Sequence, residues 1–503
     1  MNVLVIVGHP RKDSLCGALA TAFVEGAREA GIAVRELWLS DLNFDPYVRK
    51  VSPADQLDDD IPLAQGLILW ADHLVFVYPN WWGTMPALLK GFLDRVLTPG
   101  FAFACRKDGG WDRLLVGKSA QLITTMDMSQ WVYRLIYRQP GNNAMRRSAL
   151  GFCGLRTTRI LNLGPIKDAN AVQRERWLGT AKKEGLRLGY GILTPFQKAS
   201  DKAFAWLKAL RLHFYPLAWV AYSIGALGAV FNGRQFASDA YWVGYLVLFL
   251  LEVVTVLSNE YFDFDTDRLN RNHGPITGGS RILVDKRLSF REVRWGIGFA
   301  LMLATGLAGW LIWQCDVPIR ASVTVLVVLF IIAPGYTTPP LKLVYRGLGE
   351  LNVGITHSIG VLLCGYVFQG GLWNDPFPWL VSLPLFFSIL PAIILSGIPD
   401  YDADKAASKN TLSVIYGPGR VIFLAIGCAV LAIGSAAILR QDSAVNVLFG
   451  PWIYPAFLHA VVLVGILYSY SRQYRQPGRI DGLMIISLSY SVWFGVSPLI
   501  ALI

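Results

Sequence analysis

The stretch "YWVGYLVLFLLEVVTVLSNEYFDFDTDRLN" (241–270) joins a long apolar run directly to a cluster of carboxylates. Four acidic residues, Glu260, Asp263, Asp265 and Asp267, follow the run within ten positions. A charged side chain near the centre of a bilayer costs about 2.5–3.5 kcal/mol on insertion scales. A membrane helix that ends in this way therefore needs a positive partner for its carboxylates.

Apolar runs of similar length recur from residue 213 to the end of the 503-residue chain. About twenty apolar residues are needed to cross the hydrocarbon core of a bilayer. Nine runs approach that length, and the fourth is the shortest: 213–232, 240–258, 295–314, 319–335, 350–370, 377–397, 419–439, 448–470 and 481–503. The sequence predicts an all-α membrane domain of nine transmembrane helices over residues 213–503.

The lysines and arginines between these runs predict the orientation of the chain in the membrane. The loops on the side of the amino terminus carry fifteen basic residues, and the opposite loops carry three. The fifteen are Arg268, Arg271, Arg281, Lys286, Arg287, Arg291, Arg294, Lys342, Arg346, Lys405, Lys409, Arg420, Arg472, Arg475 and Arg479, against Arg234, Arg320 and Arg440. The positive-inside rule places the amino-terminal half and the long loops in the cytoplasm, at a prokaryotic inner or plasma membrane.

The same charge asymmetry explains much of the formal net charge of +11. We therefore expect no nucleic-acid partner; anionic lipid or a diphosphate ligand fits the basic loops better. The six cysteines are scattered singly, with no CxxC pair, so neither a zinc site nor a disulfide framework is expected. The start "MNVLVIVG" is too short and lacks the basic residues of a secretory signal.

Residues 193–212 predict an amphipathic helix between the two halves. One helical stripe carries Phe196, Ala199, Ala203, Trp206, Leu207 and Leu210. Lysines and an arginine fall largely elsewhere, which is typical of a helix lying in the membrane surface. The alternative is an ordinary amphipathic helix packed on the soluble domain.

Two acidic stripes follow the second and the sixth apolar runs. Asn259, Asp263 and Asp267 are spaced i, i+4, i+8, and Asp400 and Asp404 are spaced i, i+4. Each set falls on one face of a helix. Mg²⁺ commonly binds one or two carboxylates together with substrate phosphates, so two facing stripes predict metal ions that hold a diphosphate as a leaving group. The alternative is solvated loop charges paired with nearby Lys and Arg.

The motif "NEYFDFDTD" (259–267) resembles the first aspartate-rich motif of the UbiA-type intramembrane prenyltransferases, NDxxDxxxD. "DYDAD" (400–404) resembles their second motif, DxxxD. Within that family, "YTTPPLKLVYRGLGE" (336–350) and "GPITGGSRIL" (274–283) are most similar to the dihydroxynaphthoate branch of menaquinone synthesis. The resemblance covers about 210–503. It implies nine spans, a cytoplasmic active site, Mg²⁺, a polyprenyl diphosphate and an aromatic or quinone acceptor.

Site residues carry over by position from this resemblance. The implied metal ligands are Asn259, Glu260, Asp263, Asp267, Asp400 and Asp404, and Glu260 departs from the family's aspartate by one methylene. The implied catalytic residues are Asp263, Asp267, Asp400, Asp404, Lys342 and Arg346. Contacts to the diphosphate are implied for Arg281, Tyr336, Lys342, Arg346 and Lys409, although the family's Tyr-x-x-x-Lys spacing is longer here.

Residues 1–192 predict a different kind of domain. "MNVLVIVGHPRKDSLCGALATAFVEGAREAG" (1–31) has the pattern of a buried strand, a polar loop and a helix. Four further apolar strands follow, "VRELWL", "HLVFVYP", "SAQLITT" and "TRILNLG", with helices between them. The alternation predicts an α/β domain with a parallel five-stranded sheet, helices on both faces and a ligand at the carboxyl ends of its strands.

"YPNWWGTMPALLKGFLDRVLTPGFAF" (78–103) and "GHPRKDS" (8–14) resemble the flavodoxin-like NAD(P)H:quinone oxidoreductases over about 1–190. The resemblance implies FMN or FAD, NAD(P)H and a homodimer through this domain. It assigns the flavin to His9, Ser14, Leu15, Cys16, Pro79, Asn80, Trp81, Trp82, Thr124 and Thr125. Met126, Asp127 and Met128 stand where the family has glycines, and Tyr133 and Tyr137 are candidates for its missing Tyr and His.

Together these features predict Mg²⁺-dependent transfer of a polyprenyl group to an aromatic quinone precursor. The fused reductase would keep the acceptor or the product reduced, since a hydroquinone is the better nucleophile. Two alternatives remain open. One is prenyl transfer to a lipid or sugar phosphate with a non-redox soluble domain, and the other is a transporter regulated by a flavodoxin-like module.

Overall fold

The computed structural model describes residues 1–47, 60–106, 110–193, 195–270, 272, 274, 277–442, 445–475 and 478–503. Arg271, one of the basic loop residues counted for topology, lies outside these ranges. The chain divides into two compact units, Met1–Lys198 and Ala199–Ile503. Each is described by itself.

The amino-terminal unit is built on a five-stranded parallel sheet, as the sequence predicts. Its strands lie in the order β2-β1-β3-β6-β7. Their bounds are β1 Asn2–Val7, β2 Ala33–Trp38, β3 His73–Pro79, β6 Ser119–Thr125 and β7 Arg156–Leu163. The chain starts at β1, goes to one side for β2, then crosses back to β3. This order puts a topological switch point between β1 and β3, where ligands of doubly wound folds bind.

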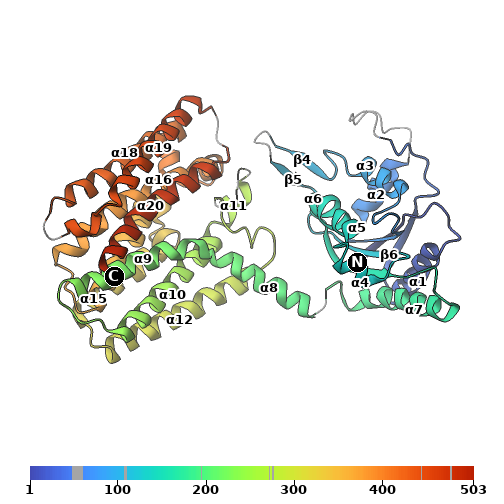
Figure 1. Ribbon diagram of the computed structural model, residues 1–503, viewed down its shortest axis with the longest axis horizontal. Helices are drawn as coiled ribbons and strands as arrows, with labels where there is room; N and C mark the ends of the chain where they lie inside the picture. The colour runs from blue at the N-terminus through green and yellow to red at the C-terminus, as the bar shows by residue number, and fades with distance from the viewer. Residues whose placement is uncertain are drawn as a thin grey trace. The chain divides into compact units, whose positions relative to one another are not determined.

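Helices cover both faces of this sheet (Figure 1). α1 (Leu15–Glu29) and α7 (Ala171–Arg187) pack with Val3, Val5 and Val7 of β1. α2 (Ile61–Trp70) and α3 (Ala87–Val96) pack with Leu4 and Ile6 of the same strand, on the other face. The alternation along β1 follows from side chains pointing to opposite faces of a strand, so all five residues are buried. The short strands β4 (Phe103–Cys105) and β5 (Trp111–Arg113) form an antiparallel pair apart from the sheet.

Shorter elements follow β6 in the same unit. They are α4 (Gln130–Leu135), α5 (Pro140–Asn143), the π-helix η2 (Ala144–Leu150), α6 (Gly151–Cys153) and, after α7, the 3₁₀ turn η3 (Leu188–Tyr190). The segment that connects β6 to β7 lies near the loop that follows β3, because Gly141 N donates to Gly83 O at 2.9 Å.

The second unit is helical, and nine of its described helical stretches are long and apolar enough to cross a membrane. They are Phe196–Phe231, which contains α9 (Tyr215–Phe231), α10 (Ser238–Phe262), α12 (Phe290–Gln314), Ile319–Tyr336, which contains α13 (Ile319–Ile332), α14–η7–α15 (Gly349–Phe368), α16 (Pro376–Ala406), α18 (Pro418–Leu439), α19 (Ile453–Gln473) and α20 (Asp481–Leu502). Each overlaps one predicted run, so the nine-span prediction is confirmed.

Several spans run past the ends of their apolar runs. α10 continues into the first acidic motif and ends at Phe262, and α16 continues through the second to Ala406. The short helix α11 (Phe264–Leu269) follows α10 directly, and α17 (Leu412–Tyr416) follows α16 after a short loop. The acidic motifs therefore stand on helix ends and not on free loops.

The 3₁₀ turns η5 (Pro334–Tyr336), η6 (Leu343–Tyr345) and η8 (Asn446–Phe449) connect other spans of this unit. The span α14 (Gly349–Ile355)–η7–α15 (Val361–Phe368) contains a π-helical turn, η7 (Thr356–Gly360). α16 contains Pro384, Pro391 and Pro399 in its interior. π-helical turns are often found at functional sites.

The amphipathic segment forms α8 (Pro195–Leu210), which is separated from α9 by the turn η4 (Leu212–Phe214). Arg211 marks the break with a φ of 50°. Ala205 and Ala209 are buried against α10 and α12, and Trp206 and Leu210 pack partly there. Phe196 and Leu207 of the predicted stripe are exposed, and so is Phe204.

Candidate functional site

The first acidic motif stands where α10 gives way to α11. Asp263 caps both helices with a φ of −93°. The backbone still joins Asp263 N to Asn259 O and Asp267 N to Asp263 O, each at 2.9 Å. The i, i+4, i+8 relation is therefore kept through the junction, and all three side chains line one cavity.

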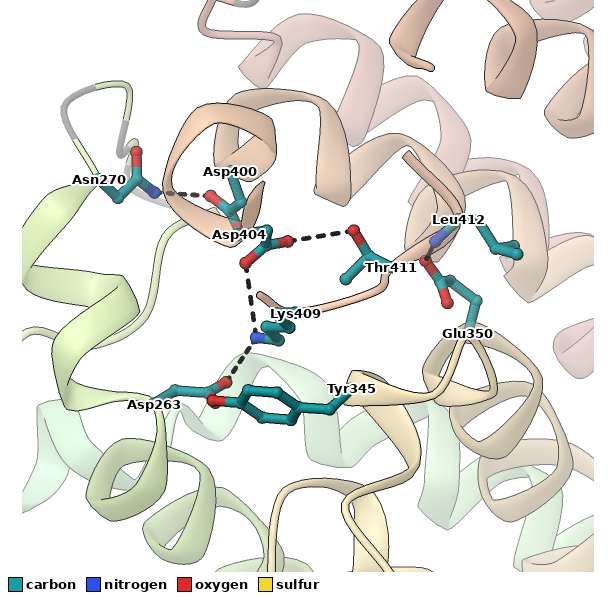
Figure 2. A network of polar contacts seen from close by, with 9 residues as sticks. All are labelled: Asp263, Asn270, Tyr345, Glu350, Asp400, Asp404, Lys409, Thr411 and Leu412. Atoms are coloured by element: carbon teal, nitrogen blue, oxygen red, sulfur yellow. Dashed lines mark hydrogen bonds and ion pairs between the residues drawn. The ribbon is translucent and has the colours of Figure 1, made fainter. Parts of the chain in front are cut away.

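The second acidic motif lies on the last turns of α16 and lines the same cavity. Asp400 and Asp404 reach it with the first motif, and the cavity has a volume of about 560 Å³. The side-chain amide of Asn270, just after α11, donates to Asp400 Oδ1 at 2.6 Å (Figure 2). The structure thus brings together two motifs that are more than a hundred residues apart in the chain.

Lys409 joins the two motifs. Its ammonium lies 2.7 Å from Asp263 Oδ2 and 3.7 Å from Asp404 Oδ1 (Figure 2). All three side chains are buried, so the charges are partly neutralised inside the protein. Burial alone would lower the pKa of Lys409, but the carboxylates of Asp263 and Asp404 hold this pKa well above its usual range.

Asp267 of the first motif lines the same cavity. Burial raises its pKa well above the usual range, and the carboxylates of Glu260, Asp263 and Asp400 raise it further. The loop residue Gly279 approaches closely: a Cβ atom there would lie 2.2 Å from Asp267 Oδ2. Gly279 also has a φ of +74°, so a side chain at this position is doubly disfavoured.

Three further side chains complete the polar network, and the sequence did not single them out. The Tyr345 hydroxyl donates to Asp263 Oδ1 at 3.1 Å, and Thr411 Oγ1 donates to Asp404 Oδ2 at 3.2 Å. Glu350 Oε1 accepts a hydrogen bond from Leu412 N at 2.9 Å, which ties α14 to the loop carrying Lys409. Burial, followed by the charge of Asp263, raises the pKa of Tyr345 to about 12, so this phenol stays a donor.

The donor set suits a hard divalent cation. Asn259 Oδ1 and Asp404 Oδ1 are buried and accept no hydrogen bond from the described residues. Across that part of the chain, no three acidic, histidine or cysteine side chains converge into a ready metal site. Mg²⁺ typically takes one or two carboxylates and completes its shell with water and substrate phosphate, so the oxygens of the two motifs fit it.

A large part of the remaining cavity wall is apolar. Leu217 and Val220 of α9, Ile389 and Ile393 of α16, and Leu488 and Val492 of α20 line it. The cavity therefore combines a charged end with a hydrocarbon-lined extension. That combination fits a ligand with an anionic head and an apolar tail.

The remaining predicted residues divide between the cavity and its surroundings. Tyr336 lines the cavity with Lys409, whereas Glu260, Arg281, Lys342 and Arg346 are absent from its wall. Glu260 instead accepts hydrogen bonds from Ser280 and from Leu283 N, because neighbouring helix positions point in directions about 100° apart.

The three cationic side chains that do not line the cavity contact backbone carbonyl groups or an aromatic ring. Arg281 donates to Asp267 O, and Arg346 donates to Pro340 O at 3.0 Å. The ammonium of Lys342 lies 5.1 Å from the centre of the Tyr345 ring. Arg281 and Lys342 thus contact residues of the acidic network without reaching the cavity themselves.

In the amino-terminal unit, the predicted flavin residues gather at the carboxyl ends of β1, β3 and β6. Ser14 caps α1 and accepts a hydrogen bond from Gly17 N at 3.1 Å, and Leu15 opens the helix. His9 packs edge-on against Trp81, with ring centroids 5.8 Å apart. The amino-terminal end of α1 thus follows the loop that leaves the carboxyl end of β1, a place that suits a phosphate.

The Pro-Asn-Trp-Trp loop is fixed by its backbone. Asn80 N donates to Thr125 O at 2.7 Å, and Trp81 and Thr84 exchange backbone hydrogen bonds at 2.9 and 3.1 Å. Pro79 ends β3 within the sheet. Trp82 is fully exposed and has a φ of 53°. A large aromatic residue held in this conformation, out in solvent, is a feature of ligand-binding loops more than of a core.

Cys16, Thr124 and Thr125 are close to this loop, since Asn80 N donates to Thr125 O and Cys16 contacts Thr125. Cys16 Sγ is 3.3 Å from Thr125 Oγ1, and Thr124 Oγ1 donates to Asn162 Oδ1 at 2.6 Å. All three are buried. Burial raises the pKa of Cys16 to about 11, so its thiol is protonated at neutral pH.

The substituted turn after β6 places Asp127 away from these groups. Asp127 Oδ1 accepts a hydrogen bond from Lys167 N at 3.1 Å, and its side chain is exposed. Tyr133 is buried, and its hydroxyl contacts Gly83 O at 3.4 Å, so it supports the tryptophan loop. Tyr137 is exposed.

Two family descriptions match this chain. The flavodoxin-like fold matches residues 1–182, and the UbiA prenyltransferase family matches residues 216–488. An uncharacterized NAD(P)H oxidoreductase of Haemophilus influenzae is 31% identical over 172 residues, which is 33% of this chain and 85% of that protein. An FMN-dependent NADH:quinone oxidoreductase of Ruegeria pomeroyi is 31% identical over 25% of this chain and 69% of that protein.

A third relative is matched over little more than half of its length. It is a ribosyldihydronicotinamide dehydrogenase-like protein of Penicillium crustosum, 36% identical over 25% of this chain and 57% of that protein. Among solved structures, an NAD(P)H:quinone oxidoreductase from Methanothermobacter marburgensis is 25% identical. That match covers 37% of this chain and 96% of the other, with a TM-score of 0.33.

Proposed function

The chain belongs to the UbiA prenyltransferase family and carries a fused flavodoxin-like NAD(P)H oxidoreductase domain, and from that premise we propose its reaction. The membrane unit transfers a polyprenyl group from its diphosphate to an aromatic quinone precursor. One observation carries the proposal: two acidic motifs share a single cavity that also has an apolar stretch of wall.

The side chains of the cavity divide the work of this reaction. Asn259, Asp263, Asp267, Asp400 and Asp404 would hold Mg²⁺, which supplies charge neutralisation to the diphosphate when bound. Lys409 adds a fixed positive charge between the motifs, and Tyr336 and Tyr345 add hydroxyl groups. The apolar walls hold the tail and exclude water from the allylic carbon, so that the acceptor competes well as nucleophile. Residues outside the cavity wall would support the site: Glu260, Arg281, Lys342 and Arg346.

In the soluble unit, His9, Ser14, Leu15 and Cys16 would surround the phosphate of FMN or FAD, with Thr124 and Thr125 beneath them. Pro79, Asn80, Trp81 and Trp82 would lie along its ring. The flavin supplies hydride chemistry from NAD(P)H, and the protein supplies position and electrostatics. The reduced acceptor would then be the substrate of the membrane unit, or the prenylated product would be reduced after transfer.

The placement in the membrane also belongs to this proposal. α8 would lie at the membrane surface, since its exposed Phe196, Phe204 and Leu207 are flanked by Lys198 and Lys202. The excess of Lys and Arg in the loops beside the acidic motifs supports a cytoplasmic site.

Mass spectrometry of the products tests the reaction. Purified full-length protein is incubated with several prenyl diphosphates and with naphthoate, benzoate or quinone acceptors, with and without Mg²⁺. We expect an acceptor that gains one prenyl chain only when Mg²⁺ is present. Transfer to a lipid or sugar phosphate in its place, or no release of diphosphate at all, would contradict the proposal.

The same assay tests the coupling of the two units. NADH or NADPH should stimulate transfer to an oxidised acceptor and should be dispensable for a reduced one. If neither nucleotide changed the rate of transfer to the oxidised acceptor while the reduced acceptor was used freely, the two activities would not be coupled.

A further inference from the structure

Glu252 is an acid within the apolar part of α10 and takes no part in the reaction proposed for the two acidic motifs. It precedes Asn259 by seven residues, which is two helical turns, so it faces the same side of α10 about 10 Å deeper in the membrane. Glu252 lines the main cavity together with His357 of η7. Ionisable groups at such a depth are rare, and they usually mark substrate or ion sites.

Glu252 and His357 form a pair. His357 Nε2 lies 3.4 Å from Glu252 Oε1. The other ring nitrogen, Nδ1, lies 3.2 Å from Val353 O and 3.1 Å from Thr356 Oγ1, which fixes the orientation of the ring. The π-helical turn η7 begins at Thr356, so the distortion of the helix coincides with the position of this histidine. A buried pair of this kind is poor evidence for a stabilising role, because apolar replacements are often as stable.

A small side cavity opens beside the pair. It has a volume of about 40 Å³ and shares Glu252, Thr356 and His357 with the wall of the main cavity. This volume is sufficient for a water molecule or a hydroxyl group. Tyr215 also lines it, and the Tyr215 hydroxyl is buried without a hydrogen-bond partner among the described residues. An unpaired buried hydroxyl is unfavourable, and a polar group in the side cavity would supply its missing hydrogen bond.

The walls around this polar group are aromatic. Tyr222, Tyr245 and Phe249 line the side cavity, and the Tyr215 and Phe249 rings lie 4.8 Å apart. Among the charged groups that line the main cavity, Arg211 adds a positive charge at the break between α8 and α9. An acid–histidine pair, a free phenol and aromatic walls together match a ring that carries a hydroxyl group.

We propose that Glu252 and His357 form the recognition site for a hydroxyl group on the aromatic acceptor. Glu252 accepts the hydrogen bond of that hydroxyl, and Tyr215 contacts its oxygen. His357 is a positioning residue that orients the carboxylate. The hydrogen bond makes the ring more electron-rich and holds it deeper than the diphosphate, beside the allylic carbon. This assignment rests on the proposed prenyl transfer for its role, but the binding site is testable without turnover.

The test compares the binding of 1-naphthol and naphthalene to full-length protein in nanodiscs by fluorescence titration. Wild type should prefer naphthol by about 10- to 100-fold, the range for a hydrogen bond to a charged group. Glu252→Gln should bring this preference close to one, while Asp239→Asn, which changes an exposed acid on the first turn of the same helix, should leave it unchanged. A folded Glu252→Gln protein that keeps the wild-type preference would overturn the proposal.

A second variant keeps the test decisive if Glu252→Gln does not fold. Tyr215→Phe removes only the unpaired hydroxyl and should lower the preference for naphthol by a smaller factor. An unchanged preference in Tyr215→Phe would then count against the site. If wild type prefers naphthol through Glu252 and yet transfers no prenyl group to any acceptor, the proposed function fails while this binding site stands.

Discussion

The two units of this protein build their candidate sites in different ways. In the membrane unit, charged side chains from α10, α16 and the loop after α16 pair with one another inside the fold. In the soluble unit, the candidate flavin site combines loop backbone and exposed tryptophan side chains with the buried Cys16, Thr124 and Thr125, at the ends of three strands. An unpaired charge costs far more free energy in an apolar surrounding than in water. A charged site in a membrane protein can therefore be recognised by the ion pairs of its side chains.

The largest expected effect is at the acidic motifs. Asp263→Asn or Asp400→Asn should reduce prenyl transfer by about 1000-fold or more, since each removes a group that acts on the charge of the leaving diphosphate. Product formation measured by mass spectrometry checks this. Both variants should still fold and keep their flavin content.

Asp265→Asn is the matched control, because Asp265 belongs to the same motif but its side chain is 78% exposed. Loss of activity in this control would mean that the whole acidic segment matters only for folding. Retained transfer in both Asp263→Asn and Asp400→Asn would refute a shared diphosphate site.

The next effect is at Lys409. Lys409→Met leaves the buried carboxylates of Asp263 and Asp404 without their cation, which should cost about 3–5 kcal/mol of stability and most of the activity. Lys405→Met is its control, because Lys405 is exposed beside the Tyr401 ring. Thermal unfolding in detergent measures both. An equal stability for the two variants would show that Lys409 does not join the motifs.

A smaller effect is expected in the soluble unit. Trp82→Ala should weaken flavin retention by about tenfold, because one stacking surface is lost while the backbone contacts remain. Trp111→Ala is the control: Trp111 is also exposed but stacks on Phe152 at 4.7 Å in a different part of the domain. The ratio of flavin to protein absorbance after gel filtration reports the outcome. If both variants lost flavin to the same extent, the tryptophan loop would not be part of the flavin site.

The smallest effect concerns Cys16. With a pKa of about 11, Cys16 is almost entirely a thiol at pH 8, and burial restricts access to it. Iodoacetamide should therefore modify the exposed Cys105 first, and labelling of Cys16 should increase as the pH rises toward 11. Peptide mass spectrometry distinguishes the two sites. Rapid labelling of Cys16 at pH 7 would contradict its burial beneath Thr125.

Much of the fold follows from residue patterns along the chain. Strands buried on both faces appear as continuous apolar runs, such as Val3 to Val7, and membrane helices appear by length alone. Helical spacing also predicts that Asn259, Asp263 and Asp267 share a face, because that relation is local.

Contacts across the chain could not be predicted in the same way. The motif resemblance carried Glu260 over as a metal ligand, but the structure places it toward Ser280 and Leu283. Tyr345, and not only Tyr336, reaches the acidic network, because the turn η6 brings it to Asp263. A signal for Glu252 was present: it is an acid within an apolar run, seven residues from Asn259.

The most direct test of the central claim measures the binding of a non-reactive prenyl thiodiphosphate in the presence of Mg²⁺. The account predicts that Asp263→Asn and Asp400→Asn each weaken binding, and that the double variant loses less than the sum of the two effects, since both carboxylates act on one ligand. Additive losses, or a loss confined to one motif, would contradict a single cavity shared by the two motifs.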